Sequence, residues 1–169
     1  MDSFLVGKLQ AEAAVKSTGG KGNYVILMGS AGHSVANEIT RGVESVLKNY
    51  PNIKVVMKKN HDNWAANLAM ATVENALTQN KNNIQAVLAN NSGMARGAVQ
   101  ALGEQGLAGK VFVAGADADL AAIKDIVAGK QQFEVLKDIA PLAQKAAQVA
   151  FELAQGKTPV STEIVKSGS

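Results

Sequence analysis

The stretch VFVAGADADLA, residues 111–121, joins a short apolar run to two acids. An apolar run of this length with little polar alternation is typical of a strand that is buried on both faces of a parallel sheet. Asp117 and Asp119 follow at once, and aspartate is favourable at the N-cap and in the first turn of a helix. The stretch therefore predicts a strand, a turn and the start of a helix. It leaves open whether Asp117 caps that helix or holds a ligand.

The same alternation of strand and helix runs through the whole chain. Strands that are connected by helices form right-handed βαβ units, which build a parallel sheet with helices on both faces. We therefore expect an α/β fold: a doubly wound, mostly parallel five-stranded sheet with a flavodoxin-like plan. The expected helices cover residues 4–17, 34–49, 64–80, 93–105, 118–128 and 140–155, and the expected strands cover residues 24–29, 52–58, 84–90, 110–115 and 131–137.

The composition describes a globular domain. The chain has 169 residues, of which 47% are hydrophobic and 18% charged, and it lacks cysteine, which excludes disulfides and thiolate metal sites. The net charge of +3 forms no basic stripe, so we expect no nucleic-acid partner. No stretch approaches the roughly 20 apolar residues of a membrane span. The first residues, MDSFLVGKLQ, do not resemble a signal peptide, so we expect none in this chain.

Polar side chains follow the expected strands at the carboxyl edge of the sheet, where ligands bind in open parallel folds. The polar residues are those of the segment GSAGHS after the first strand, Asn91 after the third, Asp117 after the fourth and Lys137 after the fifth; the only tryptophan, Trp64, follows the second. An aromatic ring offers a stacking surface to the C–H faces of a sugar, while carboxylate, amide and ammonium groups bond its hydroxyls. This combination indicates carbohydrate binding.

Each candidate also has a purely structural interpretation. Trp64 can be a partly buried packing residue, and Asn91 and Ser92 can cap the next helix, as Asp117 can cap the one after it. Arg41, within the expected helix 34–49, can pair with Glu38 three residues earlier.

Catalysis receives little support from the sequence. The two histidines, His33 and His61, lie on different expected loops without metal-ligand spacing, and Ser30 and Ser34 have no paired base. The segment GSAGHS, residues 29–34, precedes a helix and offers an alternative, the phosphate cradle of a flavodoxin-like cofactor domain. We expect a binding protein rather than an enzyme, with no cofactor and no metal.

Seven segments, taken in order, cover nearly the whole chain: GKLQAEAAV, GNYVILMGS, ITRGVESVLK, NALTQNKNNIQAVLANN, GMARGAVQAL, VAGADADLAAIKDIVAGKQQFEVLKD and AAQVAFELAQGK. Together they resemble the pentose-binding group of the periplasmic sugar-binding proteins. The resemblance implies one lobe of a two-lobed receptor that closes over a pentose, with D-xylose as the expected sugar. It implies delivery to the permease of an ABC importer, and a periplasmic or extracellular location for the full-length family.

The resemblance also implies roles for individual residues. Arg41 matches an arginine that bonds sugar oxygens, and Trp64 matches the aromatic that stacks on the ring. Asn91 matches the asparagine of the family's Asn-Asp pair, and Lys137 matches a polar residue that reaches the sugar. Asp117 matches the acid that accepts hydrogen bonds from sugar hydroxyls. Asp119 is then left as the helix cap.

Two departures from the family pattern affect these expectations. Ser92 stands where the family usually has an aspartate after the asparagine. The chain also corresponds to the carboxy-terminal lobe alone, residues 1–138, with a helix over 139–156 and a tail over 157–169. In the family that helix packs on the amino-terminal lobe; here we expect it to fold back on the sheet or to dock on a second copy.

A lone lobe leaves a sugar exposed on one side, so we expect weak binding or none. The alternative function is that of a structural module or a self-associating half without a ligand.

Overall fold

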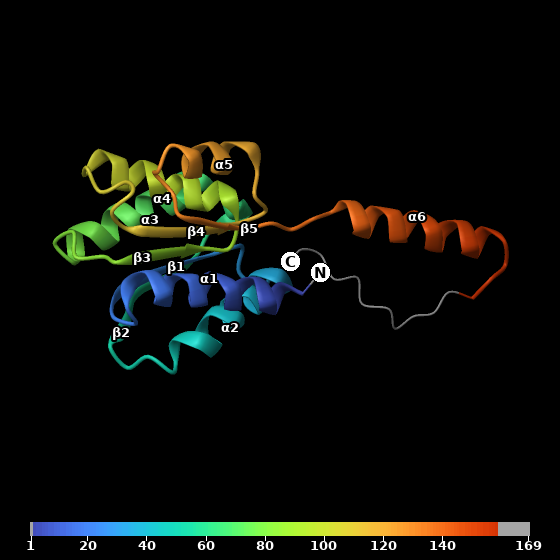
Figure 1. Ribbon diagram of the computed structural model, residues 1–169, viewed down its shortest axis with the longest axis horizontal. Helices are drawn as coiled ribbons and strands as arrows, with labels where there is room; N and C mark the ends of the chain where they lie inside the picture. Colours follow the sequence, from blue (N-terminus) through green and yellow to red (C-terminus); the bar gives the residue numbers. More distant parts are fainter. Residues whose placement is uncertain (1, 159–169) are drawn as a thin grey trace.

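The computed structural model describes residues 2–158 and has the expected α/β architecture (Figure 1). The elements are α1 (Ser3–Thr18), β1 (Gly22–Met28), α2 (Ser34–Leu47), β2 (Ile53–Asn60), the short 3₁₀ helix η1 (Asp62–Trp64), α3 (Ala66–Gln79), β3 (Ala86–Ala89), α4 (Ser92–Glu104), β4 (Phe112–Ala116), α5 (Leu120–Val127), β5 (Phe133–Val135) and α6 (Ala140–Ala154). Of these, only η1 has no counterpart among the expected elements.

The five strands form one sheet in the order β2-β1-β3-β4-β5, and every neighbouring pair is parallel. The expected five-stranded, doubly wound sheet is thereby confirmed. The chain reverses its direction of progress across the sheet between β1 and β3. In open parallel sheets this point, at the carboxyl ends of the strands, is where ligands bind.

Helices α1 and α2 cover one face of the sheet, and α3, α4 and α5 cover the other (Figure 1). Strand β1 shows why its sequence is continuously apolar. Val25 and Leu27 belong to the core beneath α3 and α4, whereas Tyr24 and Ile26 belong to the core beneath α1 and α2. All four side chains are fully buried, because successive residues of a strand point to opposite faces.

Helix α1 fills the place beside α2 on its face of the sheet. Its buried residues Val6, Ala11 and Ala14 lie in the core, and its amide side chain Gln10 reaches the end of β3, where Nε2 donates to the carbonyl of Ala89 at 2.7 Å. The small alanines allow the helix to lie close to the strands. Both faces of the sheet are therefore covered before the chain reaches α6.

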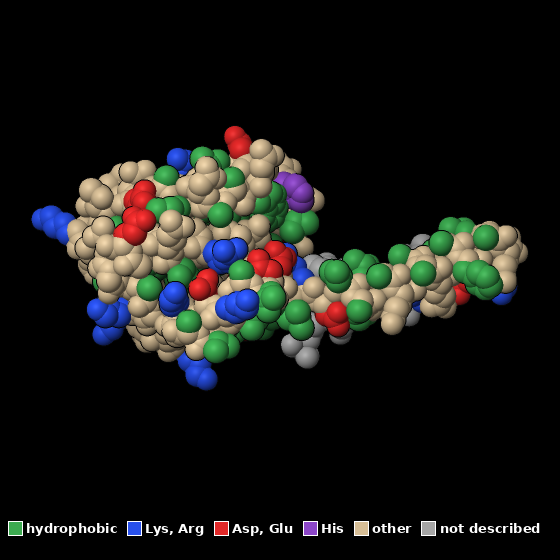
Figure 2. All heavy atoms as spheres, turned by 90° about the horizontal axis from the view of Figure 1, so that it is seen from above, with side chains coloured by type: hydrophobic (Ala, Val, Ile, Leu, Met, Phe, Trp, Pro, Cys, Tyr) green, Lys and Arg blue, Asp and Glu red, His purple; other side chains and the backbone are tan. Residues whose placement is uncertain are grey.

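Helix α6 stands clear of this body (Figures 1 and 2). None of its residues is buried, and its apolar Leu142, Phe151 and Leu153 are 42%, 64% and 56% exposed. The expectation that α6 folds back on the sheet is wrong, because α1 already occupies the face beside α2. The part of the expected tail beyond residue 158 lies outside the described residues. Within residues 2–158, no helix combines the length and the apolar character needed to cross a membrane.

Candidate functional site

The ends of three strands are tied together at Gly29. The backbone N–H of Gly29 donates to Asn90 Oδ1 at 3.1 Å, and its carbonyl accepts from Asn60 Nδ2 at 2.8 Å. Asn90 follows β3 and Asn60 ends β2, so side-chain amides join β1 to both of its neighbours. Asn90 is fully buried. These bonds fix the loops at the point where the strand order reverses.

Trp64 lies directly on Gly29. A Cβ atom at position 29 would be only 2.3 Å from the indole ring, so the ring uses the space that the missing side chain leaves. The half-buried indole also packs against the core beneath α3 and α4, and it meets the His33 ring edge to face at a centroid distance of 5.3 Å. Both the packing role and a free portion of the ring are therefore present.

The loop that carries Trp64 is held by His61. This imidazole is 1% exposed; Nδ1 donates to the carbonyl of Met28 at 3.0 Å, and Nε2 lies 2.9 Å from Thr72 Oγ1 on α3. Burial lowers the pKa of His61 below its usual value, so the ring is neutral at pH 7. A further bond, from the Asn63 N–H to Ser30 Oγ at 2.9 Å, joins the loop to the segment after β1.

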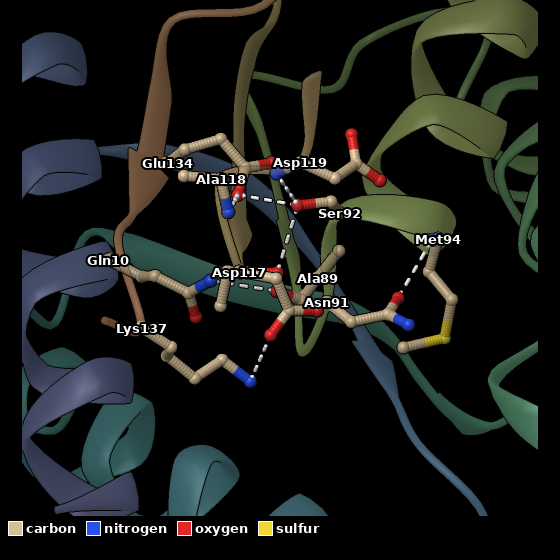
Figure 3. Close-up of polar contacts among 11 residues, drawn as sticks. Gln10, Ala89, Asn91, Ser92, Met94, Asp117, Ala118, Asp119, Glu134 and Lys137 are labelled. Carbon is tan, nitrogen blue, oxygen red and sulfur yellow. Dashed lines mark hydrogen bonds and ion pairs between the residues drawn. The ribbon is translucent and has the colours of Figure 1, made fainter. Parts of the chain in front are cut away.

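Asp117 and Lys137 form an ion pair across the ends of β4 and β5 (Figure 3). The Lys137 Nζ lies 2.5 Å from Asp117 Oδ1, and the lysine side chain is 12% exposed while the aspartate is 45% exposed. One carboxylate oxygen is thus engaged with the lysine, while the side chain as a whole remains accessible. A half-exposed carboxylate beside a largely covered ammonium can accept one hydroxyl proton and donate to a neighbouring oxygen.

The backbone that carries Asp117 is strained. Asp117 has φ of 113° and Ala118 has φ of 57°, two successive non-glycine residues with positive φ. Such conformations cost of order 1–3 kcal/mol each and persist only where the surroundings impose them. A hydrogen bond beside this turn answers the question that the sequence left open. Asp119, not Asp117, caps α5, and its Oδ1 accepts from the Ala122 N–H at 2.7 Å.

Ser92 and Glu134 support this turn, and no local sequence pattern predicts that Glu134 reaches it. The Ser92 hydroxyl, 1% exposed, lies 3.0 Å from the carbonyl of Ala116 and 2.9 Å from Glu134 Oε2, two acceptors for its one proton. Glu134 Oε2 also accepts from the Ala118 N–H at 3.2 Å. Burial raises the pKa of the Glu134 carboxyl above its usual value, although hydrogen bonds from Gln131, Ser92 and Ala118 oppose the shift.

Asn91 is the N-cap of α4. Its Oδ1 accepts from the Met94 N–H at 2.8 Å, so the structural interpretation of Asn91 is confirmed. The predicted capping role of Ser92 is wrong, because its hydroxyl faces β4 and β5 instead. A contact of Asn91 with a sugar stays a prediction, and it would have to use the part of the amide that the cap leaves free.

Among the contacts described for residues 2–158, none places Arg41 at this edge of the sheet. Arg41 pairs with Glu38 on the outside of α2, its side chain is 65% exposed, and its guanidinium lies 6.0 Å from the ring centre of Phe4 on α1. The pairing with Glu38 that the spacing allows is confirmed. The sugar-binding role of Arg41 stays a prediction.

Four of the five candidate residues therefore lie along one edge of the sheet, in the order in which the strands run. Trp64 covers the end of β1, Asp117 follows β4 and Lys137 follows β5. Since β1 and β4 are separated by β3, the strand end that Trp64 covers and the strand end that Asp117 follows are about 10 Å apart. Asn91 follows β3 between them. Among the described residues there is no cluster of acids and histidines suited to a metal ion.

A groove of about 640 Å³ lies elsewhere, between α3, α4 and the segment before β5, and Met70, Arg96 and Lys130 are among its lining residues. None of the candidate residues lines it. The chemistry at the strand ends is therefore the stronger candidate.

Comparison with known proteins gives one consistent family. The sequence profile of the periplasmic binding protein domain matches residues 1–158. The D-xylose-binding periplasmic protein of Escherichia coli (strain K12) is 44% identical over 99% of this chain and 51% of its own length. The protein of the same name from Haemophilus influenzae is 46% identical over 92% of this chain and 48% of its own length. The chain thus spans about half the length of these relatives.

Solved structures agree with the sequence comparison. A periplasmic solute-binding protein of an ABC transporter from Actinobacillus succinogenes with bound D-allose superposes with a TM-score of 0.91 at 32% identity, over 98% of this chain and 58% of that chain. A periplasmic binding protein of the arabinose ABC transporter from Shewanella superposes with a TM-score of 0.91 at 25% identity, over 99% of this chain and 56% of that chain. The chain belongs to the periplasmic binding protein family, whose members are binding proteins and not enzymes.

Proposed function

We propose that this member of the periplasmic binding protein family is the carboxy-terminal lobe of a pentose-binding protein, with D-xylose as its sugar. Two relatives at 44% and 46% identity bear the name of D-xylose-binding proteins, which supports this choice. The observation that carries the proposal is the Asp117–Lys137 pair at the carboxyl edge of the sheet. It offers an accessible carboxylate in direct contact with an ammonium group.

Each residue of the edge has a part in this proposal. Asp117 accepts a hydrogen bond from a sugar hydroxyl through the oxygen that Lys137 leaves free, and Lys137 donates a hydrogen bond to a neighbouring hydroxyl oxygen. Trp64, held on Gly29, offers an aromatic face to the C–H groups of the ring. Asn91 and Arg41 belong to the proposal as further polar contacts, Arg41 only if its side chain leaves Glu38. The array suits an uncharged polyol because no uncompensated charge faces the ligand.

A single lobe supplies one side of such a site. A sugar bound at the edge of the sheet keeps its opposite face in water, so fewer of its hydroxyls are paired and less of its surface is buried. We infer weak binding for the lone lobe and tight binding only when a second lobe closes over the sugar. The full receptor would then present the sugar to an ABC importer permease.

Helix α6 is the proposed contact to that second lobe. Leu142, Ala146, Val149 and Leu153 recur at spacings of four, three and four residues, and this pattern places them on one side of the helix. Figure 2 shows apolar side chains along the exposed length of α6. A helix with an apolar stripe and no buried residue requires a partner surface, and the amino-terminal lobe of the receptor is the occupant we propose. A second copy of this chain is the alternative.

Isothermal titration of the chain with D-xylose and D-ribose, up to tens of millimolar, tests the proposed sugar site. We expect saturable heat with D-xylose, lost in Asp117→Asn and kept in the control Asp125→Asn, whose carboxylate lies on α5 away from the edge. A folded wild-type chain that gives no heat would refute binding by the lone lobe. Heat that persists in Asp117→Asn would refute the site.

Light scattering after size-exclusion chromatography tests the role of α6. A monomer that becomes a 1:1 complex with a separately produced amino-terminal lobe supports the proposal. A dimer of the chain alone that is lost in Leu153→Lys would favour the second copy instead.

A further inference from the structure

The turn at Asp117 has a support that the proposed sugar contacts do not use. Three successive backbone N–H groups, those of residues 117, 118 and 119, each point to a separate acceptor. The Asp117 N–H donates to the carbonyl of Val135 at 3.0 Å, the Ala118 N–H to Glu134 Oε2 at 3.2 Å and the Asp119 N–H to Ser92 Oγ at 3.4 Å. Two of these acceptors are side chains, and those side chains contact each other at 2.9 Å.

We propose that Glu134 is a positioning residue, whose carboxylate, together with the Ser92 hydroxyl, holds the Asp117–Ala118 turn in the conformation that presents Asp117 to a ligand. The first part of this inference concerns the turn alone. Its consequence for sugar affinity rests on the proposed function.

The carboxylate of Glu134 occupies a place that the fold has shaped for it. A Cβ atom at Gly115 would lie 2.0 Å from Glu134 Oε1 and 2.9 Å from the Cβ of Ala95, so only glycine leaves room for the carboxylate. Gln131, itself 1% exposed, donates from Nε2 to Glu134 Oε1 at 2.7 Å. Each oxygen of Glu134 therefore has a defined partner, and Figure 3 shows the side chain turned toward Ala118 and Ser92.

The geometry separates the role of Glu134 from that of Asp117. Lys137 binds Asp117, whereas Glu134 binds the backbone of the next residue and the hydroxyl of Ser92 on α4 (Figure 3). Asp117 is 45% exposed at the edge, and Glu134 lies behind it, partly buried. An acid in this position acts on the ligand only through the turn. Without it, the Ala118 N–H loses its acceptor, and the strained turn at positions 117 and 118 loses one of the bonds that hold its positive φ values.

Amide hydrogen exchange on the ¹⁵N-labelled chain tests the inference without a ligand. In Glu134→Ala we expect the Ala118 amide to exchange about tenfold faster or more, because a bond to a charged acceptor is lost. The φ-dependent coupling constant of Asp117 should also move away from its wild-type value. In Glu134→Gln an amide oxygen can still accept from Ala118, so we expect most of the protection to return.

Two further variants keep the test decisive. Val73→Ala weakens the core beneath α3 without touching the turn, so it should raise exchange at Ala118 no more than at Ile26 of β1. Ser92→Ala removes the other support and should accelerate exchange at Asp119, which provides the measurement if Glu134→Ala does not fold. The inference would be overturned if exchange at residues 118 and 119 were unchanged in both Glu134→Ala and Ser92→Ala. It would also be overturned if Val73→Ala raised exchange at Ala118 as much as Glu134→Ala does.

Sugar titration of the same variants separates the two proposals. If the wild-type chain binds D-xylose, Glu134→Ala should weaken binding and Glu134→Gln should restore most of it. Wild-type affinity in Glu134→Ala would overturn the positioning role toward the ligand. If the wild-type chain gives no heat, the proposed function of the lone lobe fails, while the exchange data still decide whether Glu134 holds the turn.

Discussion

Replacing Gly29 with alanine is expected to displace Trp64 from the end of β1. A Cβ atom at this position would lie 2.3, 2.4 and 2.5 Å from three atoms of the indole ring. Carbon atoms in favourable contact are about 3.5–4.0 Å apart, so the ring must shift by about 1 Å or more. Asn90 and Asn60 hold the backbone of Gly29 from both sides, so the ring and not the strand is the part that moves.

The expected energetic cost follows from this overlap. Extra atoms in a well-packed region typically cost about 1–3 kcal/mol, and we expect the free energy of unfolding of Gly29→Ala to fall by that amount. The control is Gly103→Ala on α4, where an added Cβ meets no atom within 4 Å. Alanine is the better helix former by up to about 1 kcal/mol, so the control should be as stable as the wild type or more so.

Urea unfolding followed by circular dichroism gives the free energies, and the emission of Trp64, the only tryptophan, reports its environment. We expect emission from Gly29→Ala at longer wavelength, because the indole moves toward water. Unchanged stability together with unchanged emission would refute the conclusion that the Trp64 indole packs directly on Gly29.

Three further predictions concern the same edge of the sheet. Asp119→Ala should lower the free energy of unfolding by about 1 kcal/mol through loss of the α5 cap, measured by urea unfolding; no change would contradict the capping role. Burial raises the pKa of the Glu134 carboxyl, so the folded state favours its protonated form. The contribution of protonated Glu134 to the free energy of unfolding is full below about pH 4.3 and is lost as pH rises through the folded pKa. The difference in unfolding free energy between wild type and Glu134→Gln should show that slope, and a flat difference would contradict it. Burial lowers the pKa of His61, so its stabilisation is present above about pH 6.5 and is lost as pH falls through the folded pKa. His61→Gln should remove this acid-side slope in thermal unfolding between pH 7 and 5.

Helix α6 shows how context decides what a sequence pattern becomes. Its residues read as an ordinary amphipathic helix, and the helix forms where it was expected, over Ala140–Ala154. The position of α6 relative to the sheet could not be predicted from the same pattern, because an apolar stripe does not specify which surface will cover it. Helix α1, more than a hundred residues earlier in the chain, already covers the face of the sheet on which α6 would have to lie.

The sequence by itself determined the alternation of strands and helices, because apolar periodicity and capping residues act within a few positions of the chain. It placed Asp117 and Lys137 at the carboxyl edge and Asp119 at the start of α5 for the same reason. Only the tertiary structure decided that Glu134 meets Ser92, 42 positions apart, that Trp64 rests on Gly29, and that Asp117 adopts a positive φ. Those contacts depend on which strands become neighbours and how closely they approach, and no local pattern of residues carries that information.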